Sequence, residues 1–330
     1  MEVQWLDVID AAYHIDGGDD VWLSNVMGAA TPMMSRGLGM VGVLYDASRP
    51  GIFHSEHIAI GGMPMEGVTP ELCREALEPG PEGAPLVQEL FGRVQCALVS
   101  ETLAKCFPNL LKYTPDGAPD IFFINSTDPT LQGCVLSANV PDHAPIEPAM
   151  HLFWSRLSAH LVTAYRLRRR LRTQKGTPLE QAEAILTPEA KVAHATDAAG
   201  DSEVRELLSE TVRTQARLRA KDRRADPHAV GEWKALVDGR WSLVEHVDTD
   251  GKRMITAQRN ESATSGTIGL SQHEQQVLSY ATLGHSNKLI AYELGLAHST
   301  VRVLLARAAS KLGARGREET LRKFKSSSPT

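Results

Sequence analysis

The sequence has 330 residues, of which 42% are hydrophobic and 23% are charged. This composition is that of an ordinary globular protein and excludes a fibrous or intrinsically disordered chain. Because a single hydrophobic core stops growing at about 250–300 residues, we expect two or three domains. The formal net charge of −5 argues against a protein that covers nucleic acid with its whole surface.

Two absences bear on the cellular compartment. No apolar run approaches the ~20 residues that a membrane-spanning helix needs, and the N-terminus lacks the basic and apolar stretches of a signal peptide. We therefore expect a cytoplasmic protein with no membrane partner. The four cysteines are far apart and form no Cys-x-x-Cys pair, which favours free buried thiols over a redox sensor or a zinc site. They are Cys73, Cys96, Cys106 and Cys134.

Apolar and β-branched runs separated by turn residues predict the elements of the first segment, residues 1–172. In chain order these are helices Gln4–His14 and Val21–Met34, strands Gly37–Tyr45 and Phe53–Ile60, helices Thr69–Leu77 and Leu86–Leu103, strands Ile121–Asn125 and Gly133–Asn139, and a long helix from Ala149 to about Arg172. Thr69 followed by Pro70 is a typical helix start. The order of elements resembles a GAF domain, so we expect an α+β, GAF-like sensor module at residues 1–172.

The second segment, residues 179–259, begins and ends with pairs of predicted strands. Its elements are strands Ala182–Leu186 and Lys191–Thr196, a polar helix Ser202–Lys221, and strands Arg240–Val247 and Lys252–Arg259. Asp250-Gly251 between the last two strands is a good hairpin signal. This order resembles a truncated PAS domain, so we expect a PAS-like module here. Residues 260–269 are mostly small and polar, and we interpret them as a linker.

Charge is distributed unevenly along the chain. From Ile268 to Thr330 there are nine Lys and Arg residues but four Asp and Glu residues, so this part carries +5 and the remainder carries −10. A basic module joined to an acidic body indicates that only the module meets an anionic partner.

Three short helices are predicted within Leu270–Leu312. Ser271 and Glu274 have the spacing of a capping box, in which each side chain binds a backbone N–H at the helix start. Ser286 is placed to cap the second helix, and Gly295 supplies the left-handed residue at its end. A turn of about three residues leads into a third helix that crosses the second. This arrangement presents the third helix to the major groove of DNA.

The same region carries a long motif at fixed spacing. Its positions are Leu270-Ser271-x-x-Glu274, Val277-Leu278, Gly284-x-Ser286-Asn287-Lys288-x-Ile290-Ala291-x-x-Leu294-Gly295, Thr300-Val301-Arg302-Val303 and Lys311-Leu312-Gly313-x-Arg315. This pattern resembles the LuxR-type helix-turn-helix from end to end, over about Leu270–Phe324. The resemblance implies an all-α, four-helix DNA-binding domain at residues 270–330. A fourth helix at Arg317–Phe324 would serve dimerisation.

For the whole chain, the resemblance implies a transcription regulator with an α+β multidomain fold, in which sensor-like modules precede the helix-turn-helix domain. The expected partners are double-stranded promoter DNA, a second copy of the chain in a homodimer, and RNA polymerase. The N-terminal modules would respond to a small-molecule or protein effector that the sequence does not identify. We expect no cofactor and no metal. No nucleophile–base arrangement indicates an enzyme.

The resemblance also assigns roles to residues of the motif. Arg302 and Val303 fall where the family contacts base edges, and arginine suits guanine O6 and N7. Four further residues would face phosphates, which set register without reading sequence. These are Lys288, Thr300, Arg307 and Lys311. The predicted DNA-binding set is completed by Ser286, Asn287, Ser299 and Leu304.

Two features depart from the family pattern. Ala297 stands where a serine or threonine usually caps the recognition helix, and the loss of such a cap costs ~1 kcal/mol unless Ser299 substitutes. Leu304 and Ala306 are expected to face outward, where polar or basic residues are common. Leu304 would contact a thymine methyl group or widen the hydrophobic seam. We therefore expect modest sequence specificity that depends on phosphates and DNA shape.

Two alternatives stay open. The stretch from Arg302 to Leu312 also resembles region four of sigma factors, although the preceding Ser-Asn-Lys and the missing promoter-melting region disfavour it. A protein-interaction adaptor whose helix-turn-helix has lost DNA binding is the second alternative, favoured by Ala297, Leu304 and Ala306.

Two other features receive structural interpretations. His54 and His57 would point to opposite faces of a strand, which disfavours a metal site. The arginines between Arg166 and Arg172 end the long helix, and we interpret them as C-terminal capping residues in solvent rather than as a second DNA contact.

Overall fold

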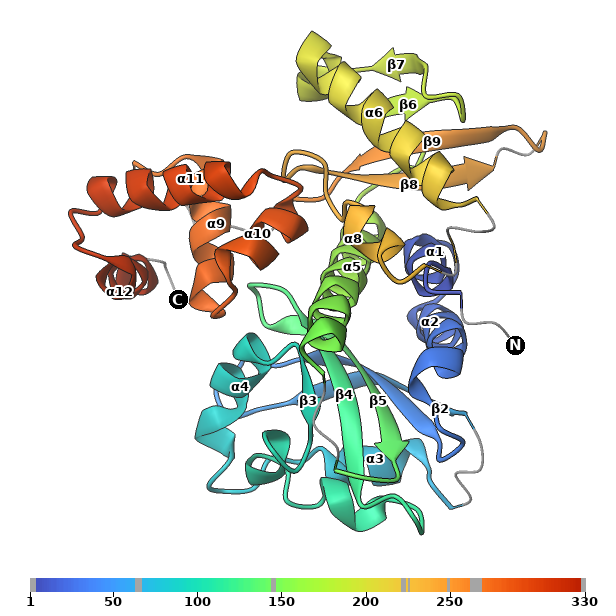
Figure 1. Cartoon of the computed structure of the whole chain (residues 1–330), viewed down its shortest axis with the longest axis vertical. Coiled ribbons are helices and arrows are strands. Elements are labelled where there is room, and N and C mark those ends of the chain that lie inside the picture. Colours follow the sequence, from blue (N-terminus) through green and yellow to red (C-terminus); the bar gives the residue numbers. More distant parts are fainter. Residues whose placement is uncertain are drawn as a thin grey trace.

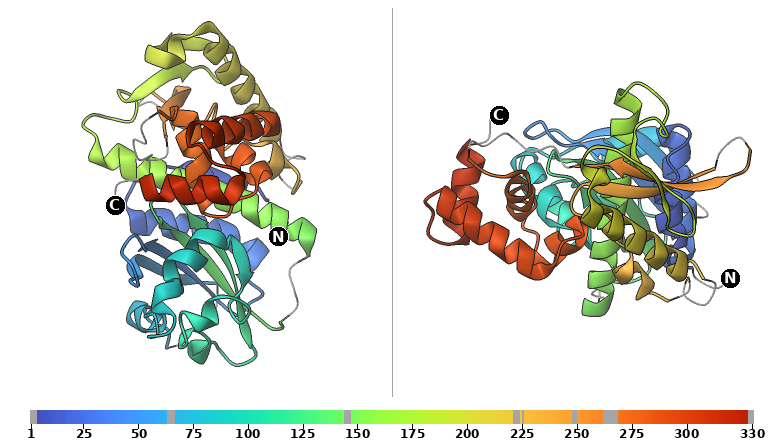
Figure 2. Two further views of the ribbon diagram at one scale, coloured as in Figure 1. Left: turned by 90° about the vertical axis from the view of Figure 1, so that its left-hand side faces the viewer. Right: turned by 90° about the horizontal axis from the view of Figure 1, so that it is seen from above.

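The computed structural model describes residues 4–62, 67–143, 147–220, 224, 226–247, 250–261 and 269–327. Two antiparallel sheets and a C-terminal group of helices surround one long helix, α5 (Pro148–Thr173) (Figure 1). Figure 2 shows α5 crossing the molecule between the two sheets. Among the described residues no single helix is long and apolar enough to cross a membrane.

The first sheet has five strands in the order β2-β1-β5-β4-β3. The strands are β1 (Met40–Asp46), β2 (His54–Gly61), β3 (Cys96–Leu98), β4 (Asp120–Thr127) and β5 (Gln132–Val140). Every residue of β4 is buried, because helices cover both faces of the sheet at that point. This explains why β4 lacks the alternation of polar and apolar residues that a half-exposed strand shows.

Two apolar clusters occupy the two faces of this sheet. Helices α1 (Asp7–Tyr13), α2 (Asp19–Met34) and α5 pack on one face. The other face is covered by α3 (Pro70–Ala76), α4 (Val87–Arg93) and three short 3₁₀ turns. These turns are η1 (Ala84–Leu86), η2 (Leu103–Lys105) and η3 (Leu110–Tyr113). As predicted, Thr69 caps α3 by accepting a hydrogen bond from the backbone N–H of Leu72.

The second sheet has four strands in the order β7-β6-β9-β8. They are β6 (Ala182–Leu186), β7 (Val192–Ala195), β8 (Trp241–Val247) and β9 (Arg253–Arg259), with the turn η4 (Asp197–Gly200) and helix α6 (Ser202–Leu218) packed against them. Leu218, Val244 and Val230, which lies in α8 (Ala229–Glu232), join the apolar cluster of α1 and α5. The two predicted modules therefore share part of a core.

The helix predicted over Leu86–Leu103 is wrong. Helix α4 ends at Arg93, Val94 takes an extended conformation, and Cys96–Leu98 forms strand β3. The strand pairs with β4 and is fully buried. The edge of β4 offers hydrogen-bond partners to the backbone groups of Cys96–Leu98. These tertiary contacts outweigh the local helical pattern.

The predicted linker over residues 260–269 is also partly wrong. Asn260 is completely buried, and its side-chain amide donates to the backbone oxygen of Thr163 at 2.9 Å and to Ser242 Oγ at 2.8 Å. It behaves as a core residue because its polar groups find partners inside the protein. Residues 262–268 lie outside the described residues, as do Lys221 and the turn residues at 248–249.

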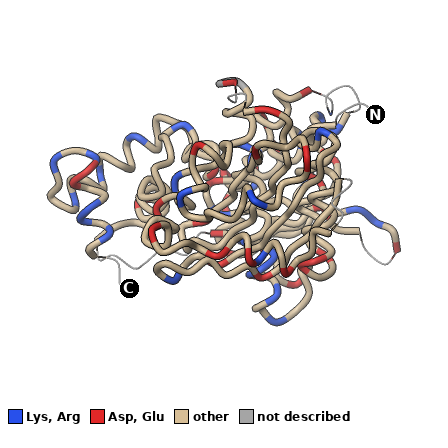
Figure 3. The backbone as a smooth tube through the Cα atoms, turned by 90° about the horizontal axis from the view of Figure 1, so that it is seen from below, with Lys and Arg blue, Asp and Glu red and all other residues tan. Residues whose placement is uncertain are grey.

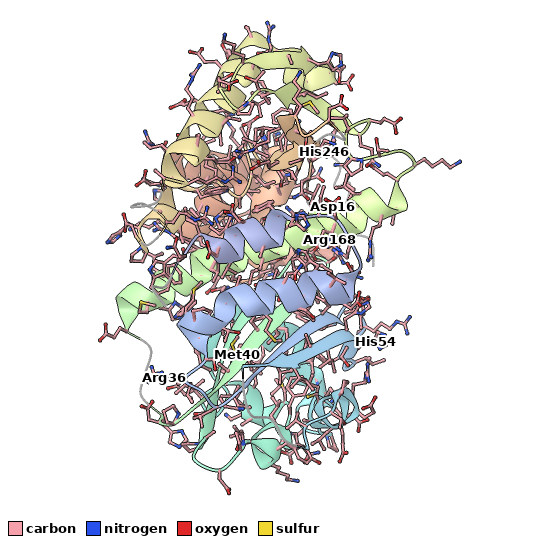
Figure 4. All side chains as sticks on the ribbon, turned by 90° about the vertical axis from the view of Figure 1, so that its right-hand side faces the viewer. Asp16, Arg36, Met40, His54, Arg168 and His246 are labelled. Atoms are coloured by element: carbon pink, nitrogen blue, oxygen red, sulfur yellow. The ribbon has the colours of Figure 1, made fainter. Side chains whose placement is uncertain are left out.

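The arginines at the end of α5 are not all solvated, contrary to the capping interpretation. Arg168 is 1% exposed and donates to the backbone oxygens of Ile15 at 2.6 Å and Gly17 at 2.9 Å. It also pairs with Asp19 at 3.2 Å. Figure 4 shows Arg168 beside Asp16, where the loop between α1 and α2 meets α5. A planar guanidinium has five N–H donors, so it can hold several loop carbonyls at once.

All four cysteines are free and buried, as the sequence predicted. Burial disfavours the thiolate and raises the pKa of the Cys96 thiol to about 12. Such thiols behave as small apolar side chains rather than as reactive groups.

The C-terminal helices dock on α5 through buried polar contacts. Nε2 of His160 lies 2.7 Å from the hydroxyl oxygen of Tyr292, which in turn donates to the backbone oxygen of Val230. Nearby, Arg166 donates to the hydroxyl oxygen of Tyr280 at 2.9 Å and to Oδ1 of Asn260 at 3.1 Å. Burial disfavours the imidazolium and lowers the pKa of His160 to about 3.

Replacing His160 by glutamine tests what this buried histidine contributes at low pH. An exposed histidine in the unfolded chain titrates near pH 6.5, whereas His160 in the folded chain titrates near 3. Below pH 6.5 the unfolded state binds a proton that the folded state does not, so stability falls as the pH drops from about 6.5 toward 3. Integrated from pH 7 to pH 5, this loss is about 2 kcal/mol.

We expect urea unfolding at pH 7 and pH 5 to show a smaller loss of stability for His160→Gln than for the wild type. Glutamine retains hydrogen-bonding groups but does not titrate. Equal losses for the two proteins would contradict the buried neutral state of His160.

Candidate nucleic-acid interface

Residues 269–327 form α9 (Gln272–Thr282), α10 (Asn287–Leu294), α11 (His298–Lys311) and α12 (Arg317–Ser327). Apolar side chains of the first three helices meet in one cluster, which α12 extends with Leu321 and Phe324. The buried members of the first cluster in this part of the chain are Val277, Tyr280, Ala281, Leu283, Ile290, Ala291, Leu294, Val301 and Leu304.

The predicted helix starts and stops are confirmed. Glu274 N–H donates to Ser271 Oγ at 3.3 Å, and Ser271 N–H donates to the Glu274 carboxylate at 2.7 Å, which completes the capping box. Ser286 Oγ accepts from the Leu289 N–H at 3.2 Å. Gly295 ends α10 with a left-handed φ of 63°. These features are local in sequence, which is why the pattern of residues alone predicts them.

Helices α10 and α11 form the crossing pair. The chain bends by 108° between them, over the short turn Gly295–Ala297. An angle of this size is typical of a helix-turn-helix unit, in which the second helix of the pair is held away from the first. Figures 1 and 2 show α11 on the outer side of the molecule, with α9 and α10 between it and the rest of the chain.

Most of the predicted contact residues lie on the uncovered side of this pair. Arg302, Val303 and Arg307 are exposed on α11, and Val303 is 48% exposed despite being apolar. Ser299 and Thr300 are exposed in the first turn of α11, and Ser286 and Lys288 are exposed at the start of α10. Asn287 accepts a hydrogen bond from Arg317 at 2.7 Å, so its side chain is tied to α12.

The predicted outward orientation of Leu304 is wrong. Its side chain is 8% exposed and belongs to the apolar core of these helices. Val301, Leu304 and Ala308 recur at intervals of three and four residues and therefore share the buried face of α11. Ala306 is exposed, as expected.

Lys311 is exposed and also has a partner within the domain. Its ammonium group donates to the Glu274 carboxylate at 2.7 Å, which ties the end of α11 to the start of α9. Burial opposes ionisation of Glu274, but hydrogen bonds from Lys311 and Ser271 outweigh it and lower the pKa of this carboxyl. Lys311 is thus part of the fold of these helices as well as a surface cation.

Positive charge collects on the lobe formed by these helices. Figure 3 shows Lys and Arg along the C-terminal lobe, whereas acidic residues are frequent on the rest of the chain. Lys288, Arg302, Arg307 and Lys311 contribute the exposed cations of α10 and α11. An exposed helix with cations on its outward face matches the charge and the width of a DNA groove.

Sequence reasoning missed how these helices are held by the preceding module. The segment Leu236–Gly239 lies against α9 and α10: Gly239 N–H donates to the Leu294 oxygen at 2.6 Å, and the Gln276 amide donates to the Gly239 oxygen at 2.9 Å. A Cβ atom at Gly295 would lie 1.9 Å from the Leu236 carbonyl oxygen. The local pattern explains Gly295 by its φ angle, but this close approach depends on residues far away in sequence.

A buried contact between a histidine and a carboxylate is a second feature that the sequence did not indicate. His285 Nδ1 lies 2.9 Å from the carboxylate of Glu293, and both side chains are 3% exposed. The pair links the turn before α10 to the last turn of that helix. Its partners are eight residues apart, and no turn or cap pattern marks this spacing.

Ala297 is the N-cap residue of α11, and no side chain caps this helix. The predicted substitute, Ser299, therefore does not supply the cap. The first turn of α11 therefore has no side-chain cap.

Residues 269–324 match the family described as bacterial regulatory proteins, luxR family. The match covers 56 of the 330 residues and spans α9, α10, α11 and most of α12. No curated protein matches the sequence. The C-terminal helices are therefore of the LuxR type, as the motif predicted, whereas the GAF-like and PAS-like resemblances stay predictions.

Serine at position 297 is expected to stabilise the start of α11. A serine N-cap is worth ~1 kcal/mol over alanine, which corresponds to roughly fivefold slower opening of the first turn. Hydrogen exchange at the amides of Ser299–Val301 measures this directly. Ala306→Ser, on an exposed mid-helix position, is the control and should not slow exchange. Unchanged exchange in Ala297→Ser would contradict the uncapped start.

Alanine at position 295 is expected to disturb the docking of these helices. Gly295→Ala places a Cβ atom against Leu236, whereas Gly313 has a similar φ of 59° with no heavy atom nearer than 3.9 Å. Both variants suffer left-handed strain of about 1–2 kcal/mol, so Gly313→Ala is the matched control. We expect Gly295→Ala to lower the Tm of the chain more than Gly313→Ala does. Equal Tm values would contradict the close contact with Leu236.

Proposed function

We propose that this chain, with its LuxR-type C-terminal helices, is a transcription regulator that binds promoter DNA as a dimer. In this proposal α11 enters the major groove, and the two N-terminal modules modulate DNA affinity or the contact with RNA polymerase. The observation that carries the proposal is the division of α11 into two faces. One face is buried in the domain core, and the other presents Arg302, Val303 and Arg307 to solvent.

The exposed face supports specific roles. Arg302, near the N-terminal end of α11, is suited to a bidentate contact with guanine O6 and N7, and Val303 to an apolar contact with a thymine methyl group. Arg307, Thr300 and Lys288 would bind phosphates on either side of the groove. The backbone N–H groups at the start of α10 favour a phosphate as well, because a helix N-terminus carries partial positive charge.

The same surface supports modest sequence specificity. With Leu304 buried in the core, Arg302 and Val303 remain as the proposed base readers on α11, and Ala306 adds no polar group. Most of the affinity would then come from phosphates and depend on salt. DNA shape would supply part of the discrimination between sites.

Dimerisation would use α12, whose inner side packs on α9 and α11 through Phe324 and Leu321. Its other side presents Glu318, Arg322 and Lys325 to solvent. A pair of domains related by a twofold axis would place two copies of α11 in successive turns of the major groove.

The burial of Leu304 also bears on the adaptor alternative. An outward Leu304 would have given α11 an apolar surface for a protein partner, and the structure removes that argument. What remains of the alternative is the small side chain of Ala306 and the uncapped start at Ala297.

Arg302→Ala and Lys288→Ala separate base reading from phosphate binding. In a mobility-shift series on DNA enriched by pull-down of the native protein, Arg302→Ala should lose about 1–3 kcal/mol on the preferred site and less on other DNA. Lys288→Ala should weaken all sequences alike and reduce the slope of log K against log salt by about 1.

Arg213 is the matched control, since it is an exposed arginine on α6 outside the helix-turn-helix. Arg213→Ala should leave DNA affinity unchanged. If the native protein enriches no sites and retards no duplex even at low salt, the adaptor alternative replaces this proposal.

A further inference from the structure

An apolar cavity, partly open to solvent, lies in the first module on the side of the sheet covered by α3 and η3. It has a volume of about 80 Å³, several times the roughly 10–15 Å³ that one water molecule needs. A concave pocket with mostly apolar walls and a few polar groups is the usual form of a small-molecule site.

The walls of the cavity change in character along one strand. Alternate residues of β5 point to the same face, and Val135, Ser137 and Asn139 all line the cavity. At the Val135 end the neighbours are aromatic or aliphatic, including Phe53 and Phe91. Toward the other end of the strand, Ser137 and Asn139 are polar but uncharged, and the lining also includes Tyr113 and Thr114.

No charged side chain is among the described residues that line the cavity. Several of the polar groups already have partners within the protein: Ser137 donates to the Val41 oxygen at 2.9 Å, and Tyr113 donates to Glu75 at 2.9 Å. An ionised ligand would leave water without a compensating charge, which is strongly unfavourable. A neutral ligand avoids this penalty.

We propose that this cavity binds a small uncharged molecule with an apolar body, of about one ring or a short alkyl chain, and a single hydroxyl or carbonyl group at one end. The body would lie against Phe91 and Val135, and the polar group would lie toward Ser137 and Asn139. The regulatory consequence of binding rests on the proposed function in transcription, whereas the binding itself does not.

Helix α4 connects the cavity to the C-terminal helices. Phe91 lines the cavity, and its backbone oxygen accepts hydrogen bonds from Asn125 at 2.7 Å and Thr127 at 2.9 Å. The next residue, Gly92, faces Leu283: a Cβ atom there would lie 3.1 Å from the Leu283 side chain. Arg93 in turn lies beside Gly284, at the turn between α9 and α10.

One short helix therefore forms a wall of the cavity and a support of the helix-turn-helix. Figure 1 shows α4 between the first sheet and the C-terminal lobe. A ligand that contacts Phe91 would favour one position of α4. Because Gly92 and Arg93 lie against Leu283 and Gly284, a shift of α4 would also move the turn between α9 and α10. Such a ligand changes DNA affinity only by binding better to one of two arrangements.

The experiment uses the full chain and three fluorinated probes followed by ¹⁹F NMR. 4-Fluorophenol has an apolar ring with one neutral hydroxyl, fluorobenzene lacks the hydroxyl, and 4-fluorobenzoate carries a charge. We expect saturable binding in the order 4-fluorophenol, then fluorobenzene, and none for 4-fluorobenzoate. Equal binding of the benzoate, or no saturable binding of any probe, would overturn the proposed site.

Ala76→Phe fills the cavity from α3, because Ala76 is a buried lining residue. This variant should lose at least tenfold in affinity for 4-fluorophenol. Ala193→Phe, the same change at an exposed position of β7, is the control and should bind as the wild type does. If Ala76→Phe does not fold, Val43→Phe fills the cavity from the sheet side, and a rise in the wild-type Tm with 4-fluorophenol gives an independent measure.

A second measurement separates the site from its effect. With DNA enriched by the native protein, saturating 4-fluorophenol should change the Kd for DNA at least threefold in the wild type and not in Ala76→Phe. Binding of the probe without any change in Kd would overturn the coupling through α4 while leaving the site in place. Binding of the probe by a chain that binds no DNA would overturn the proposed function and not the site.

Discussion

The arrangement of this molecule depends on polar side chains that helix α5 buries among three different parts of the chain. Arg168 holds the loop between α1 and α2, Arg166 reaches Asn260 and Tyr280, and His160 meets Tyr292. A buried polar group without a partner costs free energy comparable to a lost hydrogen bond or more. Each of these side chains finds its hydrogen-bond partner only when the neighbouring part of the chain is correctly docked. The buried contacts of α5 therefore favour one specific arrangement of the modules over other compact arrangements.

This constraint determines how the recognition helix is presented. Helix α10 lies on α5 and on the Leu236–Gly239 segment. Gly295 contributes both to the crossing of α10 and α11 and to their docking. Its left-handed conformation turns the chain toward α11, and its missing Cβ leaves room for the Leu236 carbonyl. The docked face and the cationic face are on different sides of the domain. Docking therefore leaves Arg302 and Arg307 uncovered.

The first module contacts these helices in two places. One is at α5, where the contacts are buried and hydrogen-bonded and therefore stiff. The other is at α4, a seven-residue helix that touches both the apolar cavity and the turn after α9. This short helix is also tied to the sheet, since Asn125 and Thr127 donate to the backbone oxygen of Phe91.

The sequence by itself determined the features that depend on residues a few positions apart. The capping box of Ser271 and Glu274, the cap at Ser286 and the left-handed end at Gly295 all follow from local backbone chemistry. The LuxR-type motif is likewise local, so its residues could be recognised without knowing what surrounds them. The strands β4 and β5 were also predicted, because β-branched runs between turns mark them.

Only the tertiary structure decided the rest. Strand β3 forms because β4 offers an edge to pair with, and Leu304 turns inward because α9 and α10 supply an apolar surface. Arg166 and Arg168 can be buried because distant carbonyl and hydroxyl oxygens accept hydrogen bonds from them. In each case a local pattern was compatible with two environments. The choice between them was made by partners far away in the sequence, whose polar and apolar groups had to be satisfied at the same time.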